Sequence, residues 1–159
     1  MTRTTRLSLW RHDLLPRKFV YVIGFKGDKF AMVLHKLRAW EMPGGRLEWH
    51  DDTYKVAAIR EFREETGYGL SIIGEIFGLE PKAEGKVLVG LITDEPPDPV
   101  NDPKIAEVCF FDALPQELSF PDVEYISMLA QARRMLETFK KGKAIGGSAS
   151  PLTQAEATE

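Results

Sequence analysis

The chain has little of several features that mark special classes of protein. It has one cysteine, Cys109, among 159 residues, so it cannot form an internal disulfide. The apolar run around Cys109 indicates a small buried hydrophobic residue. No apolar stretch approaches the ~18 residues that a membrane helix needs, and the N-terminal residues lack the apolar segment of a secretory signal. We therefore expect a cytoplasmic protein without a membrane anchor.

The chain also lacks an excess of positive charge. Its formal net charge is −3, which offers no basic field for duplex nucleic acid. With 43% hydrophobic and 28% charged residues, the composition is that of a globular protein and excludes general disorder. The length suits one domain, which we expect over residues 1–141. Residues 142–159 are rich in small and polar residues and predict a disordered tail.

Three acidic residues stand out in a segment with helix-forming composition. Residues 53–66 predict a helix that ends at Gly67, directly after the glycine-containing stretch 44–52. Glu61, Glu64 and Glu65 lie at i, i+3 and i+4, so their β-carbons would be roughly 5–6 Å apart on one side of this helix. Such like charges raise the pKa of at least one carboxylate unless a positive charge intervenes. Mg²⁺ would relieve the repulsion, because it binds oxygen ligands and keeps positions for water and phosphate.

An ordinary surface helix is the alternative, since Arg60 can pair with Glu64 at i,i+4 as a solvated ion pair. The neighbouring residues favour a site. Ala57 and Ala58 are small and precede Glu61 by one turn. The paired glycines at 44–45 permit a close backbone approach and a positive φ, so that a carbonyl oxygen could reach the same point.

Residues 45–68 resemble the Nudix box, G-x5-E-x7-R-E-U-x-E-E-x-G-U, in which U is apolar. The second half matches at every defined place, with Arg60, Glu61, Phe62, Glu64, Glu65, Gly67 and Tyr68. The preceding residues 40–45 also resemble the lead-in common in this family.

The first half of the box departs from the pattern. The pattern has one acidic residue between its glycine and its arginine. The x5 spacing after Gly45 places this residue at Asp51, whereas the x7 spacing before Arg60 places it at Asp52. The loop is therefore one residue longer than in the family, with Asp in place of Glu. Either aspartate remains a candidate for orienting Arg60.

The order of predicted elements indicates an α+β domain with a mixed sheet between helices. Strands are predicted over residues 18–25, 30–35, 70–79, 86–93 and 105–111, a helix over about 121–139, and an edge strand over 7–10 remains an option. The resemblance implies the Nudix fold, an α/β/α sandwich in which the box forms a loop-helix-loop beside the sheet.

The resemblance also implies the residues of a metal site for Mg²⁺ or Mn²⁺. Its ligands would be the Gly45 carbonyl and the side chains of Glu61, Glu64 and Glu65. Glu107 would add a ligand or base, unless it is an exposed strand residue. Glu61 is the first candidate for the catalytic base, and Arg60 would hold the cluster in place through Glu64 or an aspartate of the loop.

Candidate substrate-binding residues lie near the box in sequence. Arg46 follows the glycine pair and could bind a phosphate through its guanidinium. Lys36 and Arg38 either contact phosphates or are solvated, and Trp49 and His50 could stack on a base. The acidic, proline-rich segment 94–103 would be irregular, as a solvated connector or as the rim of the site, with the connector favoured.

The implied activity is metal-dependent hydrolysis of a phosphoanhydride in a substrate containing a nucleoside diphosphate. The main hypothesis is a nucleoside triphosphate, oxidised forms included, converted to the monophosphate and pyrophosphate. ADP-ribose or a dinucleoside polyphosphate is the alternative substrate. A non-catalytic, nucleotide-sensing module of the same family remains an alternative because of the irregular loop. The chain could also form a homodimer.

Overall fold

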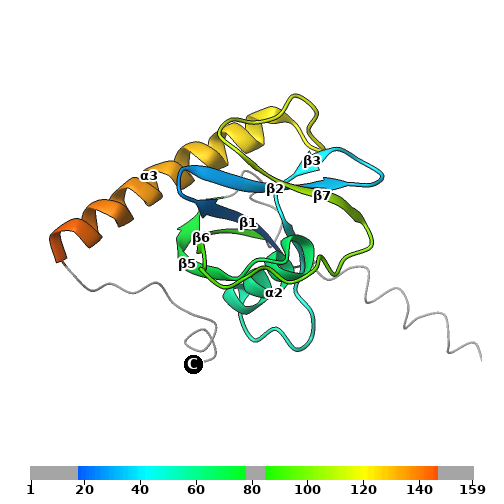
Figure 1. Ribbon diagram of the computed structural model, residues 1–159, viewed down its shortest axis with the longest axis horizontal. Coiled ribbons are helices and arrows are strands. Elements are labelled where there is room, and N and C mark those ends of the chain that lie inside the picture. Colours follow the sequence, from blue (N-terminus) through cyan, green and yellow to red (C-terminus); the bar gives the residue numbers. More distant parts are fainter. Residues whose placement is uncertain (1–17, 78–84, 147–159) are drawn as a thin grey trace, which may run out of the picture.

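The centre of the molecule is a mixed sheet with one helix on each face (Figure 1). The computed structural model describes residues 18–77 and 85–146. Its elements are β1 (Phe19–Lys26), β2 (Lys29–His35), β3 (Trp40–Glu41), β4 (Gly44–Arg46), α2 (Tyr54–Thr66), β5 (Leu70–Ile76), β6 (Gly85–Ile92), β7 (Ile105–Phe111) and α3 (Asp122–Gly146). The edge strand over residues 7–10 lies outside the described residues. Of the tail predicted over residues 142–159, residues 142–146 belong to α3, which corrects the prediction there, and residues 147–159 lie outside the described residues.

Strand order confirms the mixed sheet. The strands follow the order β3-β2-β1-β6-β5, with β4 paired to β1 and β7 paired to β2. The central pair β1 and β6 is parallel, whereas the other pairs are antiparallel. No helix among the described residues has the length and apolar character to cross a membrane.

The sheet opens between β1 and β2, and β4 occupies the opening. Next to the turn, Phe25 pairs with Phe30 and Lys26 with Lys29. The other end of β1 pairs with β4, because its backbone groups need partners of their own. The glycines of residues 44–45 thus lie in a strand. They do not use the positive φ that glycine permits, since among the described residues positive φ occurs at Gly27 and Gly67.

Two apolar clusters lie on the two faces of this sheet. On the α3 face, Ile23, Phe25, Phe30, Met32, Val89, Met128 and Leu129 pack together. On the α2 face, Val20, Val22, Ala31, Ala57, Ala58, Phe62 and Leu88 form the second cluster. Residues of β1 alternate between the two clusters, so this strand is covered on both sides. Cys109, expected to be buried, is half-buried on β7.

Helix α2 begins and ends where local signals predict. Thr53 Oγ1 accepts a hydrogen bond from the Val56 N–H at 3.2 Å, as an N-cap does. Gly67 ends the helix with φ of 81° and donates its N–H to the Arg63 carbonyl at 2.8 Å. The fully buried Ala57 and Ala58 let the helix lie close to the sheet.

Helix α3 continues past the predicted end near residue 139 to Gly146. In Figure 1 its C-terminal part extends beyond the sheet. Lys140 anchors this part through a 2.6 Å ion pair with Asp28. Gly142 does not stop the helix, because a glycine inside a helix costs only about 1 kcal/mol relative to alanine.

Two Gly→Ala substitutions are expected to change stability in opposite directions. At Gly67 a β-carbon would lie 2.0 Å from the Asp98 carbonyl oxygen, at a positive φ. We expect Gly67→Ala to lower the free energy of unfolding by about 1–3 kcal/mol or more. Gly142→Ala meets nothing within 4 Å and should raise it by about 0.5–1 kcal/mol.

Chemical denaturation of both variants measures these changes. Gly67→Ala combines an unfavourable positive φ with a collision with Asp98. Gly27→Ala tests the positive φ alone, since Gly27 has φ of 61° and open space around its β-carbon position. It should destabilise the fold less than Gly67→Ala. Equal losses for these two variants would show that the contact with Asp98 contributes nothing.

Candidate active site

Arg60 joins the loop before α2 to the carboxylates of the helix. Its Nε and Nη2 donate to the two carboxylate oxygens of Asp51 at 3.0 and 2.6 Å. Its Nη1 donates to Glu61 Oε1 at 2.9 Å and to Glu64 Oε2 at 3.3 Å. Asp52 is exposed. Asp51 is therefore the aspartate that orients Arg60.

A tight turn accommodates the extra residue of this loop. Asp51 accepts the Glu48 N–H at 2.8 Å, and its own N–H donates to the Glu48 carbonyl at 3.0 Å. Burial works to raise the pKa of Asp51, but the hydrogen bonds from Arg60 and Glu48 outweigh it and lower the pKa below its usual value. The same contact with Asp51 raises the pKa of Arg60, so this pair stays ionised.

The carboxylate of Glu61 lies directly against the backbone of Gly45. A β-carbon on Gly45 would stand 2.5 Å from two atoms of that carboxylate. Any residue other than glycine would therefore collide with Glu61. The register pairs Gly45 with Val20, and Val20 packs in the cluster on the α2 face. The glycine therefore makes room on the face of the sheet that α2 covers.

Glu65 lies one turn further along α2 and is buried as well. Its Oε2 accepts the Gly44 N–H at 3.3 Å, and its exposed fraction of 8% compares with 9% for Glu61. Burial raises the pKa of Glu61, against the opposing effect of Arg60. Burial and the nearby Glu61 together raise the pKa of Glu65 to about 9, with smaller effects from Asp102 and Glu41.

These carboxylates have the chemistry of a magnesium or manganese site. Glu61, Glu64, Glu65 and the Gly45 carbonyl are all oxygen donors, and Gly45 leaves space where a side chain would stand. In the parts of the chain that the structure describes, no three acidic, histidine or cysteine side chains already converge as ligands. Arg60 holds Glu61 and Glu64 in this arrangement, so a bound cation would take over part of that role.

The predicted substrate-binding residues are spread around the box. Trp49 is 96% exposed, and His50 Nε2 lies 3.2 Å from a carboxylate oxygen of Glu48. Lys36 is exposed. Strand alternation in β4 places Arg46 on the face opposite Gly45, although its backbone carbonyl accepts Arg60 Nη2 at 3.2 Å.

Arg38 has a partner that the sequence did not single out. Its Nε and Nη2 donate to the carboxylate of Glu41 at 3.0 and 2.8 Å. Glu41 is buried and pairs with Val33 of the neighbouring strand β2, and its charge contributes to the raised pKa of Glu65. The lead-in to the box, which contains Glu41, was the available signal.

Glu107 does not join the carboxylates of the box. Phe110 packs in the α2 cluster and Phe111 in the α3 cluster, so alternation places Glu107 with Phe111 on the α3 face. The register pairs Glu107 with Leu34, and its side chain is exposed. Asp102, just before β7, is an acidic residue outside the box whose charge raises the pKa of Glu65, as Glu41 does.

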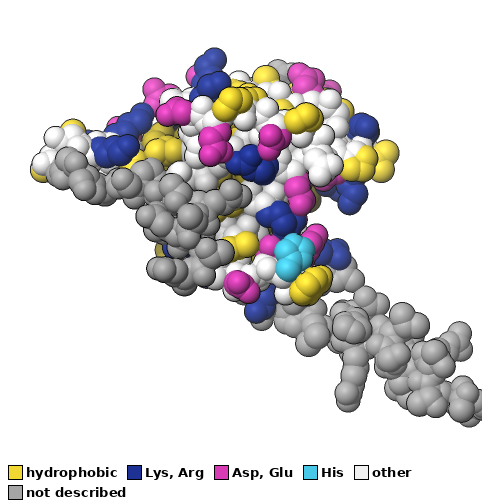
Figure 2. Space-filling view, turned by 60° about the horizontal axis from the view of Figure 1, so that its bottom comes forward, with side chains coloured by type: hydrophobic (Ala, Val, Ile, Leu, Met, Phe, Trp, Pro, Cys, Tyr) yellow, Lys and Arg dark blue, Asp and Glu magenta, His cyan; other side chains and the backbone are white. Residues whose placement is uncertain are grey.

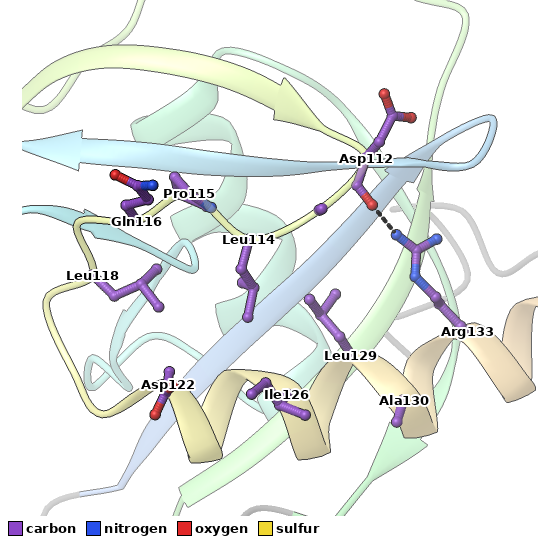
Figure 3. Close-up of a pocket in the computed structure, with 11 residues that line it drawn as sticks. Asp112, Leu114, Pro115, Gln116, Leu118, Asp122, Ile126, Leu129, Ala130 and Arg133 are labelled. Atoms are coloured by element: carbon purple, nitrogen blue, oxygen red, sulfur yellow. Dashed lines mark hydrogen bonds between the residues drawn. The ribbon is translucent and has the colours of Figure 1, made fainter.

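Two cavities of the described residues lie outside this cluster. One of about 320 Å³ lies between the C-terminal end of α2, residues 97–100 and the start of β7. The other, of about 550 Å³, lies between α3 and residues 112–118 (Figure 3). Leu114, Ile126 and Leu129 point into it, and Arg133 closes one end by donating to the Asp112 carbonyl at 2.7 Å. Neither cavity is lined by Glu61, Glu64 or Glu65.

The surface on the α2 side carries mixed charge. In Figure 2, Lys and Arg side chains alternate with Asp and Glu side chains on the visible face of the described residues. Arg63 is one example of this mixing, since it pairs with both Glu95 and Asp98.

Comparison with known proteins identifies the family. A family model described as the NUDIX domain matches residues 16–131. This range includes β1 to β7, the whole of α2 and the first turns of α3. The chain therefore belongs to the Nudix family. No curated protein matches it in sequence.

Several solved structures with the same fold are described as pyrophosphohydrolases, pyrophosphatases or diphosphatases. The pyrophosphohydrolase BsRppH of Bacillus subtilis is 25% identical, with a TM-score of 0.56 over 77% of this chain and 82% of that chain. An ADP-ribose pyrophosphatase from Streptococcus suis is 18% identical, with a TM-score of 0.57 over 75% and 93%. A UDP-X diphosphatase is 20% identical, with a TM-score of 0.60 over 84% and 72%. The chain is accordingly an enzyme of the Nudix hydrolase type.

The two glycines of β4 are expected to respond differently to alanine. Gly45→Ala displaces the end of the Glu61 side chain, which can move, so stability should stay near that of the wild type. Activity should fall about 100-fold, the effect of a misplacement of about 1 Å. Gly44→Ala brings a β-carbon to 2.2 Å from the Val20 carbonyl oxygen, so it should lower the free energy of unfolding by about 1–3 kcal/mol.

Hydrolysis rates and denaturation curves of both variants provide this measurement. A Gly45→Ala variant with full activity would contradict the role of the contact between Gly45 and Glu61.

The raised pKa of Glu65 predicts how the stability of the metal-free protein depends on pH. Between its usual value of 4.5 and about 9, the folded state holds a proton on Glu65 that the unfolded state releases. The contribution of Glu65 to the free energy of unfolding therefore falls as pH rises through this window. Glu65→Gln removes the effect and should raise the free energy of unfolding at pH 8 by about 1–3 kcal/mol.

Urea denaturation in EDTA from pH 6 to 9 tests this expectation. Glu137→Gln, at an exposed position of α3, serves as the control and should show the pH dependence of the wild type. A difference between wild type and Glu65→Gln that stays constant with pH would refute the raised pKa.

Proposed function

We propose that the protein is a metal-dependent pyrophosphohydrolase whose foremost substrate is a nucleoside triphosphate, hydrolysed to the monophosphate and pyrophosphate. The observation that carries the proposal is the buried pair Glu61 and Glu65, packed against the glycines of β4. Two buried carboxylates one helical turn apart are unfavourable for a merely structural helix. They are suited to binding a divalent cation together with the phosphates of a substrate.

The residues of this chain have separate roles in the proposal. Glu61, Glu64, Glu65 and the Gly45 carbonyl would hold Mg²⁺ or Mn²⁺. When bound, the cation would neutralise phosphate charge and lower the pKa of a water molecule that attacks phosphorus. Arg60 fixes the direction of Glu61 through its bonds to Asp51, and Glu61 is the candidate to accept a proton from that water.

The structural relatives support the type of bond but differ in substrate. They are a pyrophosphohydrolase, an ADP-ribose pyrophosphatase and a UDP-X diphosphatase. Another similar structure is a bifunctional protein with ADP-ribose pyrophosphatase activity, from Francisella tularensis, complexed with AMP and a manganese ion. A phosphoanhydride next to a nucleoside is the feature shared by several of these substrates. ADP-ribose and dinucleoside polyphosphates are therefore the alternative substrates.

The alternative to an enzyme is a module that binds a nucleotide as a sensor and does not hydrolyse it. The longer loop before α2 was its basis, and the structure shows that this loop still delivers Asp51 to Arg60. The intact set of carboxylates on α2 also favours an enzyme. Turnover separates the two hypotheses, because both predict nucleotide binding.

Product analysis on a substrate panel tests the proposed function. The protein would be incubated with Mg²⁺ or Mn²⁺ and ordinary triphosphates, oxidised triphosphates, ADP-ribose, UDP-sugars or dinucleoside polyphosphates. We expect a triphosphate to yield the monophosphate and pyrophosphate, and EDTA to stop the reaction. Reaction in ¹⁸O-water, followed by mass spectrometry, identifies the phosphorus that was attacked.

Glu64→Gln is the matched inactive variant. We expect it to lose activity by about 100-fold or more while keeping the unfolding midpoint of the wild type, because Glu64 is half-exposed at the helix surface. Glu137→Gln should retain full activity. A fully active Glu64→Gln enzyme would sink the assignment of Glu64, and binding of nucleotide without turnover in the whole panel would favour the sensing module.

A further inference from the structure

Arg63 fastens the acidic, proline-rich segment 94–103 to helix α2. Its Nη1 donates to Asp98 Oδ2 at 2.8 Å and its Nη2 to Glu95 Oε2 at 3.0 Å. The sequence favoured a solvated connector for this segment, but the structure fixes it along the end of the helix that carries the site. Arg63 occupies the undefined position of the box, between Phe62 and Glu64.

Backbone hydrogen bonds continue this attachment toward the site. The Asp98 N–H donates to the Gly67 carbonyl at 2.8 Å, and the Asn101 N–H donates to the Glu64 carbonyl at 2.8 Å. Gly67 leaves no room for a β-carbon beside Asp98. The segment thus bonds directly to the backbone of Glu64, one of the carboxylates of the site.

The residue after Asn101 is Asp102, whose negative charge is one of those that raise the pKa of Glu65. Asp102 Oδ1 accepts the Lys104 N–H at 2.9 Å. The Lys104 carbonyl in turn accepts the Lys36 N–H at 2.8 Å, which fixes the far end of the segment to the residues that follow β2. Asp102 is therefore held between two attachments, one to α2 and one next to β2.

We propose that Arg63 is a positioning residue of the active site: by binding Glu95 and Asp98 it holds segment 94–103 on α2 and keeps Asp102, the residue after Asn101, next to the helical turn that carries Glu64 and Glu65. The inference rests on the proposed function in that Asp102 would complete the carboxylates that hold the cation and substrate phosphates. Arg63 acts through Asp102 and does not itself touch the substrate.

The geometry favours positioning over a contribution to stability. The two acidic partners are largely exposed, at 66% and 60%, and exposed ion pairs contribute little to stability. One guanidinium bridges two carboxylates of the same segment, which the single ammonium of a lysine cannot do equally well. Arg63→Lys should therefore retain part of the function, and Arg63→Gln should lose it.

A double-mutant cycle tests the route through Asp102. Arg63→Gln and Asp102→Asn should each lower kcat by about 10–100-fold, the usual effect of residues that support a metal site. The combined variant should be no more than about twofold slower than Asp102→Asn alone. Arg134→Gln, at an exposed arginine of α3, should keep the wild-type kcat. If Arg63→Gln lowers kcat by the same factor in the wild type and in the Asp102→Asn variant, the proposal is overturned.

Amide hydrogen exchange in the metal-free protein gives a readout that does not depend on activity. Arg63→Gln should speed exchange at Asp98 and Asn101 by about 10-fold or more, while Arg134→Gln leaves it unchanged. The combined variant Glu95→Gln with Asp98→Asn removes the partners and keeps Arg63, so it should have the same effect. Unchanged protection of both amides in Arg63→Gln would refute the proposal whatever the activity.

A titration with Mn²⁺ separates this proposal from the proposed function. We expect Arg63→Gln to weaken Mn²⁺ binding by about 10-fold, and to weaken it no further when Asp102 is already Asn. If the wild type binds Mn²⁺ but hydrolyses nothing in the panel, the proposed function fails. The Mn²⁺ affinities of the wild type, the two single variants and the double variant then still decide the role of Arg63. Mn²⁺ affinity that is unchanged in Arg63→Gln would count against positioning.

Discussion

The burial of two carboxylates on one helix is the constraint on which the rest of the site depends. Glu61 and Glu65 are both nearly inaccessible to solvent, and a buried carboxylate costs several kcal/mol unless it is paired or protonated. The fold meets this cost in two ways. Arg60 neutralises Glu61, and the backbone N–H of Gly44 binds Glu65, whose raised pKa leaves it protonated at neutral pH.

This asymmetry couples cation binding to proton release. A carboxylate must be ionised to serve as a metal ligand, so binding at Glu65 would release the proton that it holds. Affinity for a divalent cation would then rise with pH up to about the pKa of Glu65. Asp51 contributes indirectly, because its two hydrogen bonds with Arg60 hold the guanidinium that also binds Glu61.

Features set by neighbouring residues could be predicted from the sequence. The start of α2 at Thr53, its end at Gly67 and the common side of its three carboxylates follow from caps and helical spacing. The mixed sheet between two helices also followed from the order of elements.

Features set by strand register could not be predicted in this way. Glu107 was a candidate ligand by its place before an aromatic strand end, but alternation in β7 turns it to the α3 face. Asp102 acts on the pKa of Glu65 from a segment distant in sequence, for which the sequence holds no local signal. The strand conformation of Gly44 was missed because it depends on the opening between β1 and β2.

The contact between Gly67 and Asp98 makes the end of α2 dependent on a distant part of the chain. A glycine that ends a helix usually completes a local motif, yet here the segment bound to it is also tied to Arg63, 35 residues from Asp98 in sequence. Fraying of the last helical turn and release of segment 94–103 would thus be one cooperative event, a small unit of local unfolding. Because Glu64 and Glu65 belong to that turn, the rigidity of the site is set by the least stable member of this unit, the irregular segment.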